Sequence, residues 1–249
     1  MRWQRRVSGA TSSALSLVRE RWPRPGLRIV LYHAVGSHVP GDTYGMSVRP
    51  AALAEQLDAL TALAPVVEVD ASPRRDALET AITFDDGFAD VLDVAAPLLT
   101  ARGMPARVFV TAELIDRPGY LSPAGVRELA SVPGITIGAH GASHRLLTRL
   151  DDAELARDLD ESRAVLEDLL GTSIDSMAYP NGAVDARVQR AVATAGFTLA
   201  ASSRWRINTP STDRLRLGRV EVVESDDRRA FVQKVVGAWD WLGVRPDPT

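Results

Sequence analysis

The stretch Ala81-Ile82-Thr83-Phe84-Asp85-Asp86-Gly87 decides the fold. Its apolar run is short and ends at two carboxylates and a glycine, which is typical of a buried strand followed by a sharp turn. In a parallel barrel, the carboxyl ends of the strands carry functional side chains to one rim. Adjacent strand residues point to opposite faces, so Asp85 and Asp86 should have different roles unless the backbone bends. One carboxylate suits a metal and the other a proton, although Asp-Asp-Gly is also ordinary turn sequence.

The composition is that of one large globular domain. A chain of 249 residues with 45% hydrophobic and 24% charged residues can bury a sizeable core. The net charge of -3 argues against a nucleic-acid-binding protein, which usually carries a basic excess. Because the chain has no cysteine, disulfides, thiolate metal sites and cysteine nucleophiles are excluded. Any metal must therefore be held by histidine and carboxylate side chains.

The first 24 residues are predicted to form a basic leader helix. Arg2, Arg5 and Arg6 stand among small apolar residues at roughly helical spacing. This pattern fits a solvated helix, or an amphipathic helix that lies on an anionic membrane surface. No apolar run is long enough to span a membrane, and no signal-peptide core follows the arginines. We expect a cytoplasmic protein, with peripheral membrane contact through residues 1–24 as the second interpretation. The main domain is expected over residues 25–243 and a disordered tail over residues 244–249.

The rest of the chain alternates strand and helix patterns, which predicts repeated βα units. Strands are expected at residues 27–35, 65–69, 79–84, 106–110, 135–139, 176–179, 198–202 and 215–222. Helices are expected at residues 49–63, 88–102, 122–131, 151–170, 185–195 and 227–242. Seven or eight such units close most naturally into a barrel of parallel strands.

The segment His140-Gly-Ala-Ser-His144 holds two of the four histidines. At this spacing, one helical turn or tight loop can present both imidazoles to one ion. The pair follows a predicted strand, as the two aspartates do, so both groups should reach the same rim. Two histidines and one carboxylate form a standard catalytic site for Zn²⁺ or a similar divalent ion. The plainer interpretation is a pair of surface-loop histidines.

Three motifs together resemble those of the polysaccharide deacetylases, carbohydrate esterase family four with the NodB-homology fold. They are Thr-Phe-Asp-Asp-Gly at 83–87, His-x-x-Ser-His at 140–144 and Tyr-Pro-Asn-Gly at 179–182. The resemblance implies an α/β fold, a distorted parallel (β/α)7 barrel. It also implies a hydrolase that removes N-acetyl, or O-acetyl, groups from a polysaccharide or its lipid-linked precursor. The implied cofactor is a divalent metal, Zn²⁺ first, with Co²⁺, Mn²⁺, Ni²⁺ and Fe²⁺ as alternatives.

The resemblance also assigns roles by position. It implies that Asp86, His140 and His144 ligate the metal and that Asp85 is the general base. It implies that Tyr179, Pro180 and Asn181 of the third motif bind substrate, with the backbone N–H of Asn181 stabilising the oxyanion. A simple β-turn is the alternative interpretation of that third segment.

Two positions depart from the family pattern. Gly141 follows the first metal histidine where many members have serine or threonine, so a hydroxyl that stabilises the loop is lost. Ala178 stands two residues before the proline of the third motif, where many members have an arginine that orients the catalytic aspartate. Arg219, Arg204 or Arg206 could supply that guanidinium.

The general acid of the family is also missing from its usual place, because no histidine follows His144. His33 ends the first predicted strand and resembles the acid histidine of the poly-N-acetylglucosamine deacetylase branch, in which the barrel is circularly permuted. An imidazole titrates near neutrality, which suits protonation of a leaving amine. A hydrogen-bonded core histidine is the alternative. Tyr44, Trp205 and Asn208 lie on segments expected near the rim, where an aromatic ring could stack on a sugar.

Two other functions stay open. A hydrolase of the same fold that acts on a cyclic imide or ureide should be active on small imides and inactive on acetylated glycans. A non-catalytic carbohydrate-binding barrel should bind oligosaccharide and release no acetate. The glycine in the histidine motif and the absent arginine favour the second of these.

Overall fold

The computed structural model describes residues 24–39 and 41–243. The predicted tail and all but the last residue of the predicted leader helix lie outside the described residues. No helix in the described part is long and apolar enough to cross a membrane.

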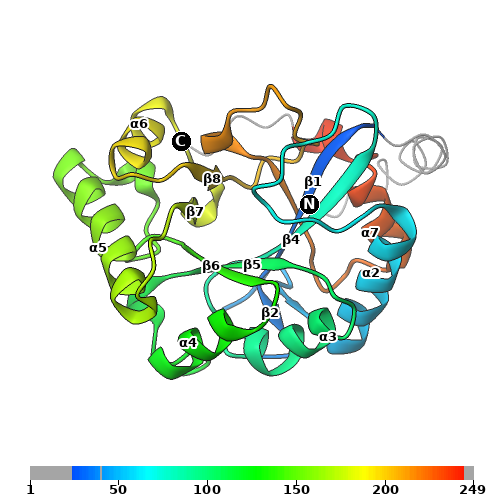
Figure 1. Cartoon of the computed structure of the whole chain (residues 1–249), viewed down its shortest axis with the longest axis horizontal. Coiled ribbons are helices and arrows are strands. Elements are labelled where there is room, and N and C mark those ends of the chain that lie inside the picture. The colour runs from blue at the N-terminus through cyan, green and yellow to red at the C-terminus, as the bar shows by residue number, and fades with distance from the viewer. Residues whose placement is uncertain (1–23, 40, 244–249) are drawn as a thin grey trace.

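A seven-stranded parallel sheet curls into a nearly closed barrel that carries helices on its outer surface (Figure 1). The order across the sheet is β8-β7-β6-β5-β4-β1-β9. Its strands are β1 (Gly26–Tyr32), β4 (Leu78–Phe84), β5 (Ala106–Val110), β6 (Ile135–Ala139), β7 (Ser176–Ala178), β8 (Leu199–Ala201) and β9 (Arg219–Glu221). The helices are α2 (Pro50–Leu63), α3 (Ala96–Thr100), α4 (Pro123–Ser131), α5 (Asp152–Leu170), α6 (Ala186–Thr194) and α7 (Arg228–Val235). The expected α/β barrel of seven parallel strands is confirmed.

The seam between the two edge strands, β8 and β9, is closed by backbone contacts outside regular strand pairing. Leu217 forms a parallel bridge with Ala201, donates its N–H to Ala200 O at 3.0 Å and accepts from Ser202 N at 2.8 Å. A second, two-stranded parallel sheet joins β2 (Ala34–Val35) to β3 (Ser47–Val48). The barrel is distorted at this seam, because a single bridge replaces a full ladder of hydrogen bonds between paired strands.

Several predicted element boundaries are wrong. Residues 65–69 make only a one-residue bridge, Val66 to Thr80, because Pro65 has no N–H to donate and β5 takes over the same edge of β4 from Thr83 onward. The strand expected from residue 215 begins at Arg219, after a 3₁₀ turn. The predicted helix at 88–102 begins with a π-helical turn, Val91–Ala95, and the last predicted helix ends at Val235 instead of residue 242.

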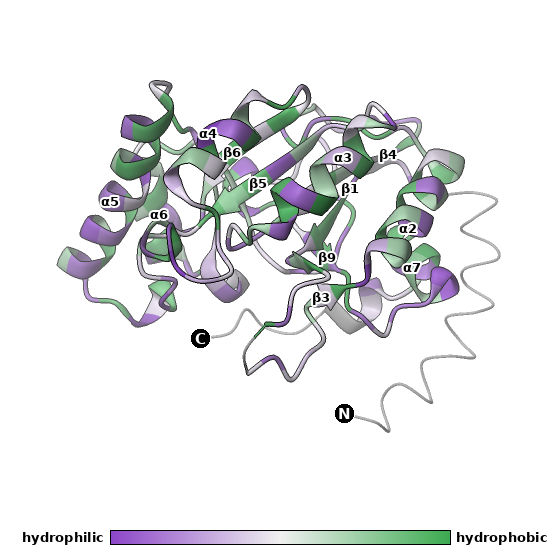
Figure 2. Ribbon diagram, turned by 90° about the horizontal axis from the view of Figure 1, so that it is seen from below, coloured by the Kyte–Doolittle hydropathy of each residue, from purple (hydrophilic) through white to green (hydrophobic). Residues whose placement is uncertain are grey.

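Helix α5 is the longest helix and is well terminated at both ends. Asp151 accepts from Glu154 N at 2.8 Å while the Glu154 carboxylate accepts from Asp151 N, which completes a capping box worth about 1 kcal/mol. Gly171 ends the helix with a left-handed φ of 67°. Helices α5 and α7 alternate purple and green in Figure 2, as expected for helices that bury one face. The buried face of α5 also carries a carboxylate, Asp158.

Candidate active site

A sharp turn at the end of β4 brings both carboxylates to one histidine. Asp86 and Gly87 have left-handed φ values of 72° and 83°, so the chain bends directly after Asp85. His140 Nε2 consequently lies 3.8 Å from Asp85 Oδ2 and 3.4 Å from Asp86 Oδ1. A non-glycine residue in this region costs roughly 1–3 kcal/mol, and such strain concentrates at functional sites. The bend thus places two neighbouring carboxylates on one side of the barrel mouth.

Asp86, His140 and His144 form a compact set of metal-ligand atoms. One ligand atom from each side chain lies within 4.8 Å of the other two. His144 Nε2 is 3.1 Å from Asp86 Oδ1, yet this buried oxygen has no hydrogen-bond partner among the described residues. Three potential metal-ligand atoms therefore converge: Asp86 Oδ1 and the Nε2 atoms of His140 and His144. No well-directed hydrogen bond joins them. This arrangement fits a divalent cation.

A backbone carbonyl orients the buried ring of His140. His140 Nδ1 lies 2.9 Å from Ala178 O, so Nδ1–H donates to that carbonyl and the lone pair of Nε2 faces Asp86. Burial lowers the pKa of His140, but Asp85 and Asp86 outweigh burial and the net pKa is raised. The same negative field would favour a metal cation at Nε2. The imidazole of His144 approaches edge-on, with ring centroids 5.1 Å apart.

Arg219 on β9 binds Asp85 through two parallel hydrogen bonds. Its Nη1 and Nη2 donate to Asp85 Oδ1 and Oδ2 at 2.6 and 2.7 Å, and both side chains are buried. Burial raises the pKa of Asp85, but the charges of Arg219 and His140 together outweigh burial. The net pKa of Asp85 is therefore lowered. Arg204 is exposed, and Arg206 donates to a backbone carbonyl. Among the three arginines left open by the sequence, Arg219 is the one that contacts the carboxylate.

His33 lies just beyond β1 with a side chain that is 12% exposed. Its Nδ1 is 3.9 Å from Glu221 Oε1 and is buried with no hydrogen bond to any residue that the structure describes. Its charge contributes to lowering the pKa values of Asp85 and Asp86, although burial and nearer groups act more strongly on both. His33 follows Tyr32, whose carbonyl accepts from Asp85 N at 2.9 Å, so it ends β1 beside the aspartate turn, and the described residues give its Nδ1 no hydrogen bond.

The third motif forms a tight turn beside the histidine loop. Asn181 is exposed with a left-handed φ of 55°, a conformation that asparagine tolerates. The amides of Gly182 and Ala183 bond back across the turn to Tyr179 O and Pro180 O. Tyr179 is buried and donates its hydroxyl to Leu215 O at 2.7 Å, so its side chain packs within the fold. Pro180 is also buried.

Tyr120 was missed by the sequence argument. It lies in the loop after β5, forms an antiparallel bridge with Phe88 and stacks on that ring with centroids 4.7 Å apart. The next residue, Leu121, donates its N–H to Gly87 O at 2.9 Å. Burial and the charge of Asp86 both raise the pKa of Tyr120. The phenol therefore lies beside the aspartate turn, and only its position in the fold reveals this.

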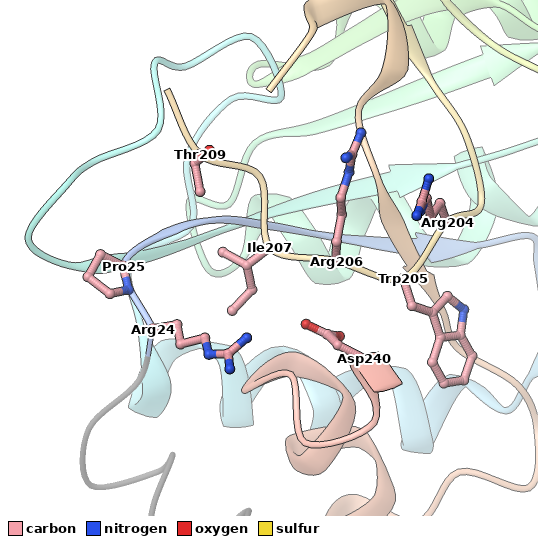
Figure 3. Close-up of a pocket in the computed structure, with 8 residues that line it drawn as sticks. All are labelled: Arg24, Pro25, Arg204, Trp205, Arg206, Ile207, Thr209 and Asp240. Carbon is pink, nitrogen blue, oxygen red and sulfur yellow. The ribbon is translucent and has the colours of Figure 1, made fainter. Parts of the chain in front are cut away.

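Two of the three residues expected near the rim, Trp205 and Asn208, are elsewhere, whereas Tyr44 is exposed in the segment between β2 and β3. Trp205 packs on Trp239 and lines a hollow of about 290 Å³ with Arg24 and Asp240, whose side chains face each other in Figure 3. Asn208 is buried and donates to Leu27 O at the start of β1. That end is seven strand residues, roughly 23 Å, from His33. The rim prediction for Trp205 and Asn208 is wrong because their loop folds back along the barrel wall.

Comparison with known proteins gives a consistent result. Residues 74–200, just over half of the chain, match the family model described as polysaccharide deacetylase. A putative polysaccharide deacetylase of Bacillus subtilis (strain 168), YxkH, is 25% identical over 150 residues, which are 60% of this chain and 53% of that protein. The chain thus matches about half the length of this relative.

Solved structures share the fold. BC0361, a polysaccharide deacetylase from Bacillus cereus, has a TM-score of 0.73 at 20% identity and covers 84% of this chain and 69% of its own. The Streptococcus pyogenes deacetylase PplD, solved with acetate, has a TM-score of 0.73 at 20% identity, with 85% and 99% covered. IcaB from Ammonifex degensii has a TM-score of 0.69 at 24% identity, with 86% and 97% covered. With its barrel, its paired aspartates and the family match, this chain belongs to the polysaccharide deacetylase family.

Proposed function

We propose that this protein is a metal-dependent hydrolase that removes N-acetyl groups, or O-acetyl groups, from a polysaccharide or its lipid-linked precursor. One observation carries the proposal: Asp86 Oδ1 faces two imidazoles and is buried with no well-directed hydrogen bond from the described residues, while the adjacent Asp85 is bound by Arg219. Two neighbouring carboxylates with such different partners suit two different roles. Membership of the polysaccharide deacetylase family supports the reaction class.

Asp86, His140 and His144 would hold the metal through Oδ1 and the two Nε2 atoms. Two imidazole nitrogens and one carboxylate oxygen suit Zn²⁺ first, and Co²⁺, Mn²⁺, Ni²⁺ or Fe²⁺ as alternatives. When bound, a cation of this kind supplies Lewis acidity that polarises a carbonyl and lowers the pKa of water. Ala178 O supports the proposed set because it fixes the tautomer of His140.

Asp85 is proposed to take a proton from the attacking water. Its lowered pKa keeps the carboxylate ionised at neutral pH, and a carboxylate has lone pairs left beyond the two bonds from Arg219. The role proposed for Arg219 is to fix the direction of those lone pairs. Removal of the guanidinium should therefore affect proton transfer more than metal affinity.

The remaining steps are assigned to the third motif and to His33. The backbone N–H of Asn181 is proposed to stabilise the oxyanion that forms as water attacks the acetyl carbon, with the turn of Tyr179 and Pro180 as its support. His33 is proposed to protonate the amine as the carbon–nitrogen bond breaks, which leaves acetate and a free amino sugar. The free Nδ1 of His33 near Glu221 supports this role.

A poly-N-acetylglucosamine-type exopolysaccharide is the proposed substrate, supported by the resemblance of the first strand to that branch. Tyr120, half-buried beside the aspartate turn, is a suitable aromatic contact for a sugar ring. The basic segment 1–24 is proposed to make peripheral contact with anionic membrane. Flotation of anionic liposomes with the full chain and with a variant that lacks residues 1–24 tests that contact.

Acetate release from a chitooligosaccharide, with Zn²⁺, Co²⁺ or Mn²⁺ added, tests the function. We expect turnover by the wild type, at least a hundredfold slower turnover for Asp85→Asn, and normal turnover for Asp76→Asn, an exposed control. Near-normal acetate release by Asp85→Asn would refute the general-base assignment. Activity on small cyclic imides alone would favour the imide hydrolase, and oligosaccharide binding without acetate release would favour the non-catalytic barrel.

A further inference from the structure

Asp158 is a buried carboxylate directly beneath the histidine loop. It lies on the inward face of α5 with Leu155 and Leu159 and is 6% exposed. Because a buried carboxylate is costly unless it is hydrogen-bonded, its partners indicate its role. It lies outside the three motifs at 83–87, 140–144 and 179–182 that resemble those of the family.

Within the part of the chain that the structure describes, the side-chain hydrogen bonds of Asp158 all go to the loop between the two histidines. Oδ1 accepts from Ala142 N at 2.9 Å, and Oδ2 accepts from Ser143 N at 3.0 Å and also from the Ser143 hydroxyl. Two backbone amides and one hydroxyl therefore converge on one carboxylate, an arrangement stronger than bonds between neutral groups.

The opposite side of the same loop is bonded as well. Ala112 N donates to Gly141 O at 3.2 Å, and Glu113 N donates to Ala142 O at 3.0 Å. The loop backbone is consequently held from α5 on one side and from the 3₁₀ turn after β5 on the other. A loop fixed in this way presents its flanking imidazoles in one geometry.

Gly141 is what allows the carboxylate to approach. Its φ is 69°, and a Cβ at this position would lie 2.9 Å from Asp158 Oδ1 and 3.2 Å from Pro180 Cγ. A serine or threonine here would meet the carboxylate and would also be strained by the left-handed backbone. Gly141, which departs from the family pattern, therefore leaves the space that the Asp158 carboxylate occupies.

We propose that Asp158 is a positioning residue of the metal site. Its carboxylate takes the place of the missing hydroxyl at position 141 and holds His140 and His144 at the separation that a cation needs. The inference rests on the proposed function, because it takes the two imidazoles as metal ligands. Outer hydrogen-bond partners of metal ligands typically change metal affinity by about 10–100-fold when they are mutated.

Cobalt titration of the chelator-treated full-length protein, followed by visible absorbance, tests the inference. Asp158→Asn keeps the side-chain volume but removes an acceptor from the loop amides, so the Kd for Co²⁺ should rise about 10–100-fold. Asp160→Asn, at an exposed position on the same helix, should leave the Kd unchanged. Leu166→Ala, buried two turns further along α5, should lower the melting temperature without changing the Kd.

Substitution of Gly141 gives a second, independent test. Gly141→Ala should weaken Co²⁺ binding more in the wild type than in the Asp158→Ala background, where the added methyl group has room. Equal fold-changes in the two backgrounds would overturn the steric pairing.

An Asp158→Asn protein that folds and binds Co²⁺ within twofold of the wild type would overturn the positioning role. If Asp158→Asn does not fold, Ser143→Ala makes the same test, with an expected rise in Kd of several-fold; an unchanged Kd would again overturn the role. A wild type that binds no Co²⁺ would refute the proposed function itself, which separates the two failures.

Discussion

Arg219→Met would leave Asp85 as a buried carboxylate without its counter-charge. The two side chains are 1% and 3% exposed and are joined by bonds of 2.6 and 2.7 Å. Removal of one partner from a buried pair costs roughly 3–5 kcal/mol, because the other charge stays desolvated. Arg219 also donates to Ser202 O and to Thr83 Oγ1, so we expect the upper half of this range. Urea denaturation at pH 7 measures the loss.

The pH dependence gives the sign of the effect. The folded-state pKa of Asp85 is lowered, so its contribution to stability is present above the unfolded-state pKa of about 3.9 and is lost as the pH falls through the folded-state pKa. Without Arg219, burial would still raise the pKa of Asp85, and of the two charges named above only that of His140 would remain to lower it. The stability gap between wild type and Arg219→Met should therefore be widest near neutral pH and narrower at pH 4 and below.

A matched double variant separates charge from packing. Arg219→Met with Asp85→Asn replaces the stranded carboxylate by a neutral amide, so it should recover part of the lost stability while remaining inactive. A loss below about 1 kcal/mol in Arg219→Met, or a double variant no more stable than the single one, would refute the buried-charge reasoning.

Three further predictions concern the mouth, the third motif and the metal. Tyr120→Ala should raise KM for an acetylated oligosaccharide about tenfold with a smaller effect on kcat, since one stacked ring contributes on the order of 1 kcal/mol; Tyr44→Ala, at an exposed position, should change neither value in steady-state assays. Gly182→Ala combines a left-handed φ of 71° with a Cβ against Ser203, and thermal melts should show a loss of at least about 1–3 kcal/mol. A chelator should lower the melting temperature and Zn²⁺ should restore it, because a ligand at 100 times its Kd stabilises the native state by about 2.7 kcal/mol; insensitivity to both would count against a metal site.

Local patterns in the sequence were enough to predict the barrel and the proximity of the main site residues. An apolar run that ends in Asp85 and Asp86, and a histidine pair that follows another strand, both place side chains at strand ends, which meet at one rim of a parallel barrel. The left-handed turn at Asp86 could be stated only as a condition, since the sequence does not reveal the backbone bend.

Contacts between distant segments could not be predicted in the same way. Arg219 lies 134 residues from Asp85, and three arginines were equally acceptable until the strand order placed β9 beside β1. Asp158 belongs to a helix whose pattern marks it only as an acidic position, although it faces inward. Tyr120 reaches the aspartate turn because its loop pairs with Phe88, a contact that no periodicity indicates.

Metal content after dialysis against Zn²⁺ most directly tests whether Asp86 is the metal ligand and the adjacent Asp85 is not. We predict about one equivalent per chain for the wild type and for Asp85→Asn, and almost none for Asp86→Asn, with all three proteins folded. Equal zinc content in the two variants, or none in the wild type, would contradict the account.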